Sequence, residues 1–223
     1  DMVPMRAALN KAHDDGRVLT DIAWRVELRP FKNAGRRRNL YLDLSQRRAL
    51  VANFEPEETD IATFTRGLSV LPLRPGALAA LRVSDFDARR SELVISRDKH
   101  GVGRKIILPS VTVTFLRELS RNKLPAAPLF TRLSGTDRAG NKKDFWDKDA
   151  WKWPIKDAAL KAKLPPSTSA YTLRHSTITD MVTGGLPLLT VAQISGTSVA
   201  MIERHYGHLV GTHAAEALAK LAL

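Results

Sequence analysis

The residues best suited to chemistry lie in two stretches of this 223-residue chain. The first contains Arg74 and is followed by a segment that carries Lys99. The second contains Arg174, and Tyr206 comes 32 residues after it. Guanidinium forks suit phosphate oxygens, a lysine can give up a proton, and a tyrosine hydroxyl can act as a nucleophile. These residue types indicate chemistry at a phosphodiester.

Four side chains would divide that chemistry between them. A phosphodiester can be exchanged without a high-energy cofactor if Tyr206 keeps the bond energy as a phosphotyrosyl ester, which a DNA 5′-hydroxyl can later reverse. Arg74 and Arg174 suit the negative charge that the transition state places on the non-bridging oxygens. Lys99 suits the protonation of the leaving 5′-oxygen, and Lys105 competes for this role. Taken singly, each has an ordinary structural interpretation, and only their joint spacing favours catalysis.

The charge of the chain favours a polyanionic partner. The formal net charge is +12, and residues 61–223 carry +11 of it, with 24 basic and 13 acidic residues. The densest part, residues 97–163, has 16 basic and 7 acidic residues, spaced among aromatic ones as on a folded surface. Such a surface suits nucleic-acid phosphates, the alternative being an ordinary solvated lysine surface.

Several classes of function are excluded or disfavoured. The chain has no cysteine, which excludes disulfides, thiol chemistry and cysteine-based zinc sites. It also has no glycine-rich phosphate loop, and His205 and His208 have no third ligand at metal-binding spacing. We therefore expect no metal and no cofactor. No apolar run reaches the roughly 20 residues that span a bilayer, and no secretory leader is visible, so we expect a cytoplasmic protein.

The elements that must position these residues are mainly helical. Residues 92–96 and 104–108 are β-rich, and the glycine-containing loop between them carries Lys99. Asp43 and Gln46 predict a capping box, and Pro56 is expected to open the following helix. We expect an α+β fold, mainly α with a small β-hairpin or sheet. The predicted helices cover residues 4–15, 44–54, 56–70, 75–82, 111–121, 144–162 with an interruption near Pro154, 172–183, 187–194, 198–206 and 212–222.

Sequence blocks in a fixed order resemble the catalytic domain of the tyrosine recombinases, the phage integrase family. That family has an L-R-x-x-E-x-x-x-L-x-x-x-D block, a hairpin lysine, an H-x-L-R-H block, an L-G-H block and a terminal R-x-Y. Here the corresponding segments are residues 73–85, Lys99, residues 171–175, residues 195–197 and residues 204–206. The resemblance covers roughly residues 40–210. A linker with Pro, Gly and a run of Arg over residues 29–42 then predicts a remnant of the core-binding domain over 1–38 and a catalytic domain over 39–223.

The resemblance implies site-specific DNA recombination or integration, by strand cleavage and rejoining through a 3′-phosphotyrosyl intermediate. Its partners would be double-stranded DNA and further copies of the protein, as a tetramer on DNA, with no membrane and with a bacterial or phage origin. The C-terminal helix over 212–222 would dock in trans or in cis. The implied catalytic residues are Arg74, Lys99, Arg174 and Tyr206, the supporting ones Tyr171, His175 and Thr197, and the DNA contacts Arg104 and Lys105.

Three positions depart from the family pattern. Tyr171 stands where the H-x-L-R-H block begins with histidine, Thr197 where the L-G-H block ends with histidine or tryptophan, and Ala77 where the first block has glutamate. Tyrosine is a poor base at neutral pH, although its hydroxyl can still donate a hydrogen bond to a phosphate. We therefore expect attenuated activity, with a catalytically decayed DNA-binding module of the same fold as the alternative. An RNA-binding protein is a third hypothesis that no sequence module supports.

Overall fold

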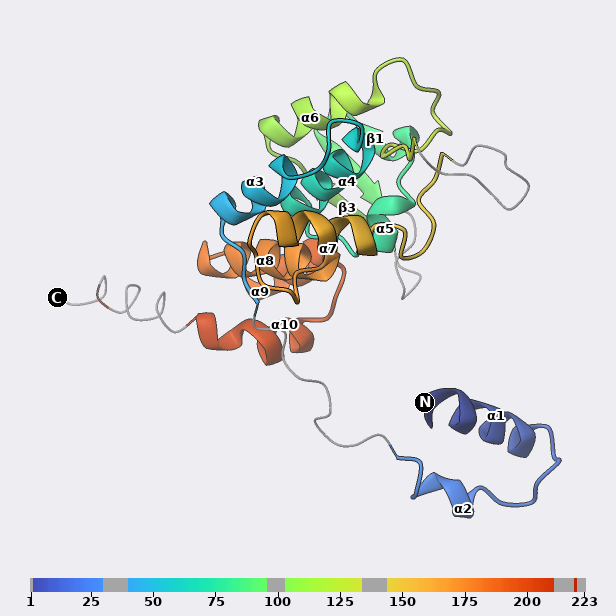
Figure 1. The fold of residues 1–223 in the computed structure, drawn as a ribbon. Coiled ribbons are helices and arrows are strands. Elements are labelled where there is room, and N and C mark those ends of the chain that lie inside the picture. Colours follow the sequence, from blue (N-terminus) through green and yellow to red (C-terminus); the bar gives the residue numbers. More distant parts are fainter. Residues whose placement is uncertain (1, 30–39, 96–102, 134–143, 211–218, 220–223) are drawn as a thin grey trace. The chain divides into compact units, whose positions relative to one another are not determined.

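The computed structural model describes residues 2–29, 40–95, 103–133, 144–210 and 219 (Figure 1). The contacts between residues divide the chain into two compact units, Asp1–Arg37 and Arg38–Leu223. In the first unit, helix α1 (Met2–Asp14) is followed by the short helix α2 (Ile22–Arg25). The buried Trp24 of α2 donates its indole N–H to Asn10 Oδ1 of α1 at 2.9 Å, which joins the two helices.

The second unit is mostly helical, with one small antiparallel sheet, and this confirms the predicted fold class. Its first helix, α3, begins at the predicted capping box of Asp43 and Gln46. The long helix α8 begins at a second capping box, made by Ser169 and Thr172. The helices are α3 (Leu44–Ala52), α4 (Thr59–Val70), α5 (Pro75–Ala79), α6 (Ser110–Ser120), α7 (Lys152–Lys161), α8 (Ala170–Thr183), α9 (Leu188–Ser195) and α10 (Val199–Tyr206), with 3₁₀ turns at Val83–Asp85 and Gly207–Leu209.

The sheet consists of β1 (Phe86–Asp87), β2 (Glu92–Ile95) and β3 (Arg104–Ile107), in that order. Strands β2 and β3 are the predicted hairpin strands, whereas the two-residue β1 was not predicted. Leu93 of β2 pairs with Ile106 of β3, and both are buried, while Lys105 and Ile107 point to the exposed face. The period of two along each strand thus gives the sheet one face toward the core.

The main hydrophobic core lies around α4. Phe64 of α4 is fully buried and stacks on Trp151 at 5.2 Å between ring centroids, and the ring of Trp146 lies tilted against it at 4.8 Å. The ring of Phe130 meets the ring of Phe64 edge-on, with 6.2 Å between the centroids. Helix α4 contacts α3, α5, α7 and α8, so this aromatic cluster fixes the position of the elements that carry Arg74 and Arg174.

A second, smaller hydrophobic cluster lies where α8, α9 and α10 meet. Its buried members come from the C-terminal half of α8 and from the two helices that follow. Helix α9 contacts α8, α10 and β3, and it therefore links this cluster to the sheet. The buried residues of this cluster are Ile178, Val182, Val191, Ala192, Ile202 and Tyr206.

Two predicted helix starts are wrong. Helix α4 begins at Thr59 and not at Pro56, because residues 55–58 close a turn instead: the Glu58 N–H donates to the Glu55 carbonyl at 2.9 Å. Helix α7 begins at Lys152 and not at residue 144, because Asp149 takes a positive φ of 66°, which no α-helix tolerates in its interior. Pro154 is not an interruption, since it lies in the first turn of α7, where its missing N–H has no helical partner to lose.

The other predicted helices occur with shifted ends. Helix α5 stops at Ala79, three residues before its predicted end, and α8 starts two residues early at Ala170. The loop with Lys99, most of the linker after residue 29 and the predicted helix over 212–222, apart from residue 219, lie outside the described residues.

Candidate active site

Arg74 is held at the N-terminal end of α5. It is the N-cap residue, with extended backbone angles, and Pro75 occupies the first helical position. Its Nη1 donates a hydrogen bond to the carbonyl of Gly196 at 2.7 Å. Gly196 ends α9 in the left-handed conformation, with φ of 66°. A helix C-terminus carries partial negative charge, so the guanidinium is attracted there.

Arg174 lies in the N-terminal half of α8 and is almost fully buried, with 8% of its surface exposed. Its Nη1 donates a hydrogen bond to the carbonyl of Pro72. Pro72 comes two residues before Arg74 in the chain. The bond therefore places the second arginine beside the segment that carries the first, as a shared site for one phosphate requires.

Tyr206 is the last residue of α10 and is also 8% exposed. Its hydroxyl forms a hydrogen bond of 2.8 Å with Nδ1 of His175, and the two ring centroids are 5.0 Å apart. Burial raises the pKa of the Tyr206 phenol above its usual value, and the positive charge of Arg174 acts in the opposite direction. Arg174 is therefore close enough to the hydroxyl to influence it, and at neutral pH the phenol keeps its proton.

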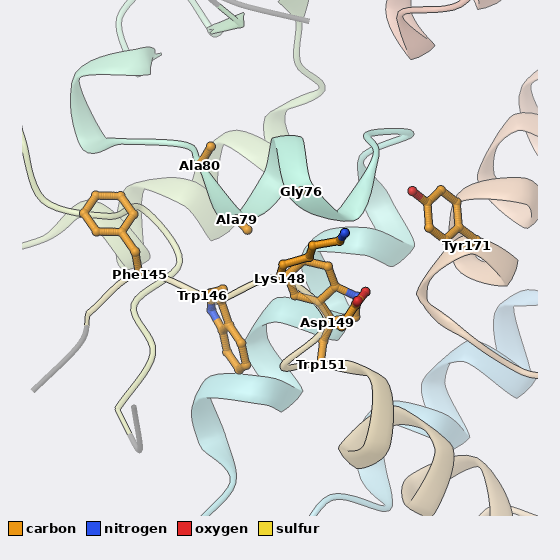
Figure 2. Close-up of a pocket in the computed structure, with 9 residues that line it drawn as sticks. All are labelled: Gly76, Ala79, Ala80, Phe145, Trp146, Lys148, Asp149, Trp151 and Tyr171. Atoms are coloured by element: carbon orange, nitrogen blue, oxygen red, sulfur yellow. The ribbon is translucent and has the colours of Figure 1, made fainter. Parts of the chain in front are cut away.

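Tyr171 is the most exposed of the predicted supporting residues, with 47% of its surface accessible. It lies in the first turn of α8 and lines a cavity of about 450 Å³ with Gly76 of α5, Trp146 and Trp151. Figure 2 shows Tyr171 at one end of this cavity and Phe145 at the other. Tyr171, at the position where the family has a histidine, therefore borders this cavity, whose lining includes neither Arg74 nor Arg174.

Thr197 and Ala77 are both half-buried near Arg74 in the chain or in space. Thr197 directly follows Gly196, and its backbone N–H donates to the Ala192 carbonyl at 3.0 Å, which closes the end of α9. Ala77 lies in the short helix α5, and its backbone N–H bonds to the carbonyl of Arg74 at 2.8 Å. Both residues therefore belong to the turns that hold Arg74.

The predicted DNA contacts on β3 differ in their surroundings. Arg104 donates from Nε to the Ile194 carbonyl of α9 at 3.2 Å. Lys105 forms an ion pair with Glu92 at 3.7 Å, and its side chain is mostly exposed. Lys99, the predicted proton donor, lies outside the described residues.

The structure brings Arg74, Arg174, His175 and Tyr206 together through elements that are far apart in the sequence. Sequence reasoning missed the two backbone carbonyls, of Pro72 and Gly196, that hold the arginines. It also did not predict the contact between His175 and Tyr206. The spacing of His175 four residues after Tyr171 was the available signal, because such residues share one face of a helix.

Within the described part of the chain, no three histidine, aspartate or glutamate side chains gather in a way that would hold a metal ion. In the same residues, none of the helices combines the length and the apolar character needed to cross a membrane.

Comparison with known proteins identifies the family. The model of the phage integrase family matches residues 41–213. The chain therefore belongs to the phage integrase family, the tyrosine recombinases, which confirms the resemblance seen in the sequence. A curated relative, the tyrosine recombinase XerA of Pyrococcus furiosus, is 24% identical over 152 residues, or 68% of this chain. The chain spans about half, 51%, of the length of that relative.

Solved structures share the fold. The Tn1549 transposon integrase in complex with a circular intermediate DNA matches with a TM-score of 0.69 at 16% identity, over 100% of this chain and 78% of that one. The catalytic domain of bacteriophage HP1 integrase matches with a TM-score of 0.57 at 16% identity, over 80% of this chain and 93% of that one. At these identities the likeness establishes the fold.

Proposed function

We propose that this chain is the catalytic part of a site-specific recombinase or integrase, which cleaves and rejoins duplex DNA through a 3′-phosphotyrosyl intermediate on Tyr206. The observation that carries the proposal is the convergence of Tyr206 with two arginines. Tyr206 bonds His175, the residue next to Arg174, and Arg174 bonds Pro72, two residues before Arg74. Family membership and the matching integrase folds support the same reading.

In the proposed reaction, Tyr206 Oη attacks the scissile phosphorus while Arg74 and Arg174 stabilise the charge on the non-bridging oxygens. Both guanidiniums are held by backbone carbonyls, so they need little reorganisation during the reaction, which is where such groups are most effective. Lys99 protonates the leaving 5′-oxygen. The charged groups of this chain thus supply the stabilisation for which other phosphoryl-transfer enzymes use a metal.

Duplex DNA is the proposed partner, with Arg104 and Lys105 of β3 among the contacts and a tetramer as the active assembly. Residues 1–38 are the proposed remnant of a core-binding domain. The +11 charge of residues 61–223 supports a phosphate-facing surface. DNA affinity should then fall steeply with salt, with a slope of about −0.9 in log K against log salt for each phosphate neutralised.

The experiment that tests the proposal is covalent capture. The protein is incubated with a library of nicked duplexes that carry a randomised central stretch, denatured, and recovered with any DNA attached to it. We expect an enriched duplex that forms an adduct with the wild type and not with Tyr206→Phe. Failure of the wild type to form any adduct would overturn the proposed catalysis.

A decayed DNA-binding module is the second candidate, which the exposed Tyr171 and the threonine at position 197 favour. It predicts salt-sensitive DNA binding without an adduct. The double substitution Tyr171→His and Thr197→His separates the two candidates, because an adduct formed only by the double variant would indicate a decayed enzyme.

A further inference from the structure

The hydroxyl of Tyr206 has a specific neighbour that the proposed function leaves unused. It forms a hydrogen bond of 2.8 Å with Nδ1 of His175, and both side chains are largely shielded from water. The ring of His205 lies edge-on to the ring of Tyr206, with 6.5 Å between centroids. The imidazole of His175 is therefore in direct contact with the reacting oxygen of Tyr206.

Helix α8 explains why His175 reaches this oxygen. Tyr171 and His175 are four residues apart, so they share one face of the helix on successive turns. Helical side chains lean toward the N-terminus of their helix, so the side chain of His175 is expected to lie over the turn that carries Tyr171. The half-buried His175 lies deeper than Tyr171, which is 47% exposed and lines the cavity.

The phenol needs a proton acceptor if it is to attack. Burial raises the pKa of Tyr206, so the hydroxyl is protonated at neutral pH despite the opposing charge of Arg174. Tyr171 is ill suited to accept the proton, because a phenol is a very weak base. A neutral imidazole with its own proton on Nε2 presents a basic Nδ1 to the Tyr206 O–H, and the observed contact has the length such a bond requires.

We propose that His175 is the general base for Tyr206, a role that replaces the missing histidine at position 171 and that rests on the proposed function. As the Tyr206 Oη–P bond forms and the P–O5′ bond breaks, the phenolic proton moves to His175 Nδ1 and the imidazole becomes imidazolium. The leaving 5′-oxygen takes a separate proton from the acid assigned to Lys99. In rejoining, the 5′-hydroxyl attacks, its proton returns to that acid, and Tyr206 leaves with the proton from His175.

Two substitutions separate proton transfer from positioning. His175→Asn keeps a polar group near the place of Nδ1 but cannot take up a proton at neutral pH, and His175→Ala removes the contact. On the duplex enriched by covalent capture, both variants should form the adduct about 10²–10⁴-fold more slowly than the wild type, as expected for loss of a general base. Imidazole added to His175→Ala should restore part of the rate, whereas it should leave Tyr206→Phe inactive.

A modified substrate then distinguishes the base from the acid. A bridging 5′-phosphorothiolate leaves as a thiolate and needs no proton, because a thiol is far more acidic than an alcohol. The defect of His175→Asn should persist on this substrate, since His175 acts on the nucleophile. Relief of the defect would assign His175 to the leaving group and overturn the proposal.

The remaining outcomes separate the proposed role of His175 from the proposed function on which it rests. An adduct formed by His175→Asn at the wild-type rate would reduce His175 to a positioning residue and overturn the proposal, while the proposed function would stand. No adduct from the wild type would overturn both. Circular dichroism and DNA affinity are measured for each variant, and His175→Asn carries the test if His175→Ala does not fold.

Discussion

Arg74 donates its Nη1–H to the carbonyl oxygen of Gly196 at 2.7 Å, although the two residues are 122 positions apart in the chain. The contact joins the turn before α5 to the end of α9. It therefore connects the family's first sequence block, which contains Arg74, to its L-G-H block, which contains Gly196. Gly196 holds its carbonyl in place through a left-handed backbone, with φ of 66°. The position of Arg74 therefore depends on a residue that has no side chain.

Gly196→Ala should disturb both stability and activity. An alanine in the left-handed region costs about 1–2 kcal/mol, and any relaxation of the backbone moves the carbonyl that holds Arg74. Asparagine adopts this conformation more readily, so Gly196→Asn should recover much of both losses. Urea denaturation and the rate of adduct formation are the measurements. Equal effects of alanine and asparagine would show that φ is not the reason for glycine here.

Arg174 should contribute to folding as well as to catalysis. Arg174→Met removes the donor for the Pro72 carbonyl inside the protein, and an unsatisfied buried acceptor costs about 1–3 kcal/mol. Arg74→Met serves as the matched control for stability, because Arg74 is only half-buried and its partner lies at a helix end. We expect the larger loss of unfolding free energy for Arg174→Met, and the reverse order would contradict the burial argument.

Removing the buried charge of Arg47 should lower the free energy of unfolding strongly. Arg47 is 5% exposed, forms an ion pair with Asp180 of α8 and donates to the Ser69 carbonyl of α4 at 3.2 Å. Arg47→Met should cost roughly 3 kcal/mol, the low end of the range for a buried pair, because the Asp180 side chain is 37% exposed. Lys105→Met, which breaks the exposed pair with Glu92, should cost less than about 1 kcal/mol. Urea denaturation of both variants tests the contrast.

Gly67 is required by close packing in the main core. A Cβ at this position of α4 would lie 2.5 Å from Cε1 and 2.7 Å from Cζ of the buried Phe130. Gly67→Ala should therefore lower the unfolding free energy by about 1–3 kcal/mol, as overpacking does. Gly76 of α5 meets nothing within 4 Å, so Gly76→Ala should be neutral or stabilising by up to about 1 kcal/mol. Thermal unfolding of the two variants decides, and equal effects would contradict the packing argument.

Tyr206 should make the protein less stable at alkaline pH. Because burial raises its pKa in the folded state, the unfolded chain loses the phenolic proton first. This contribution to stability is fully present below about pH 10, the unfolded value, and is lost as pH rises through the folded pKa. Tyr206→Phe should then show a shallower loss of unfolding free energy above pH 10. Tyr41, whose pKa is raised by its hydrogen bond to Asp180, is common to both proteins and cancels in the comparison.

The elements that local signals specify were predictable from the sequence. The capping box at Asp43, the hairpin strands and the helix that ends at Gly184 all depend on neighbouring residues, and each occurs in the structure. The start of α7 was not predictable, because the left-handed Asp149 depends on how residues 144–151 fit around the aromatic core. The spacing of the sequence blocks predicted that the two arginines and Tyr206 are site residues. It could not name the carbonyls that hold the arginines, since any residue type supplies one.

The two hydrophobic clusters carry different halves of the proposed site. Arg174 follows Leu173 of the main core, whereas Tyr206 is itself a buried member of the smaller cluster. The alignment of the proposed nucleophile with the two arginines therefore depends on how the two clusters, which share α8, pack against each other. A substitution at Val191, a buried member of the smaller cluster, would then slow the reaction by displacing Tyr206 relative to the arginines while both clusters remain folded.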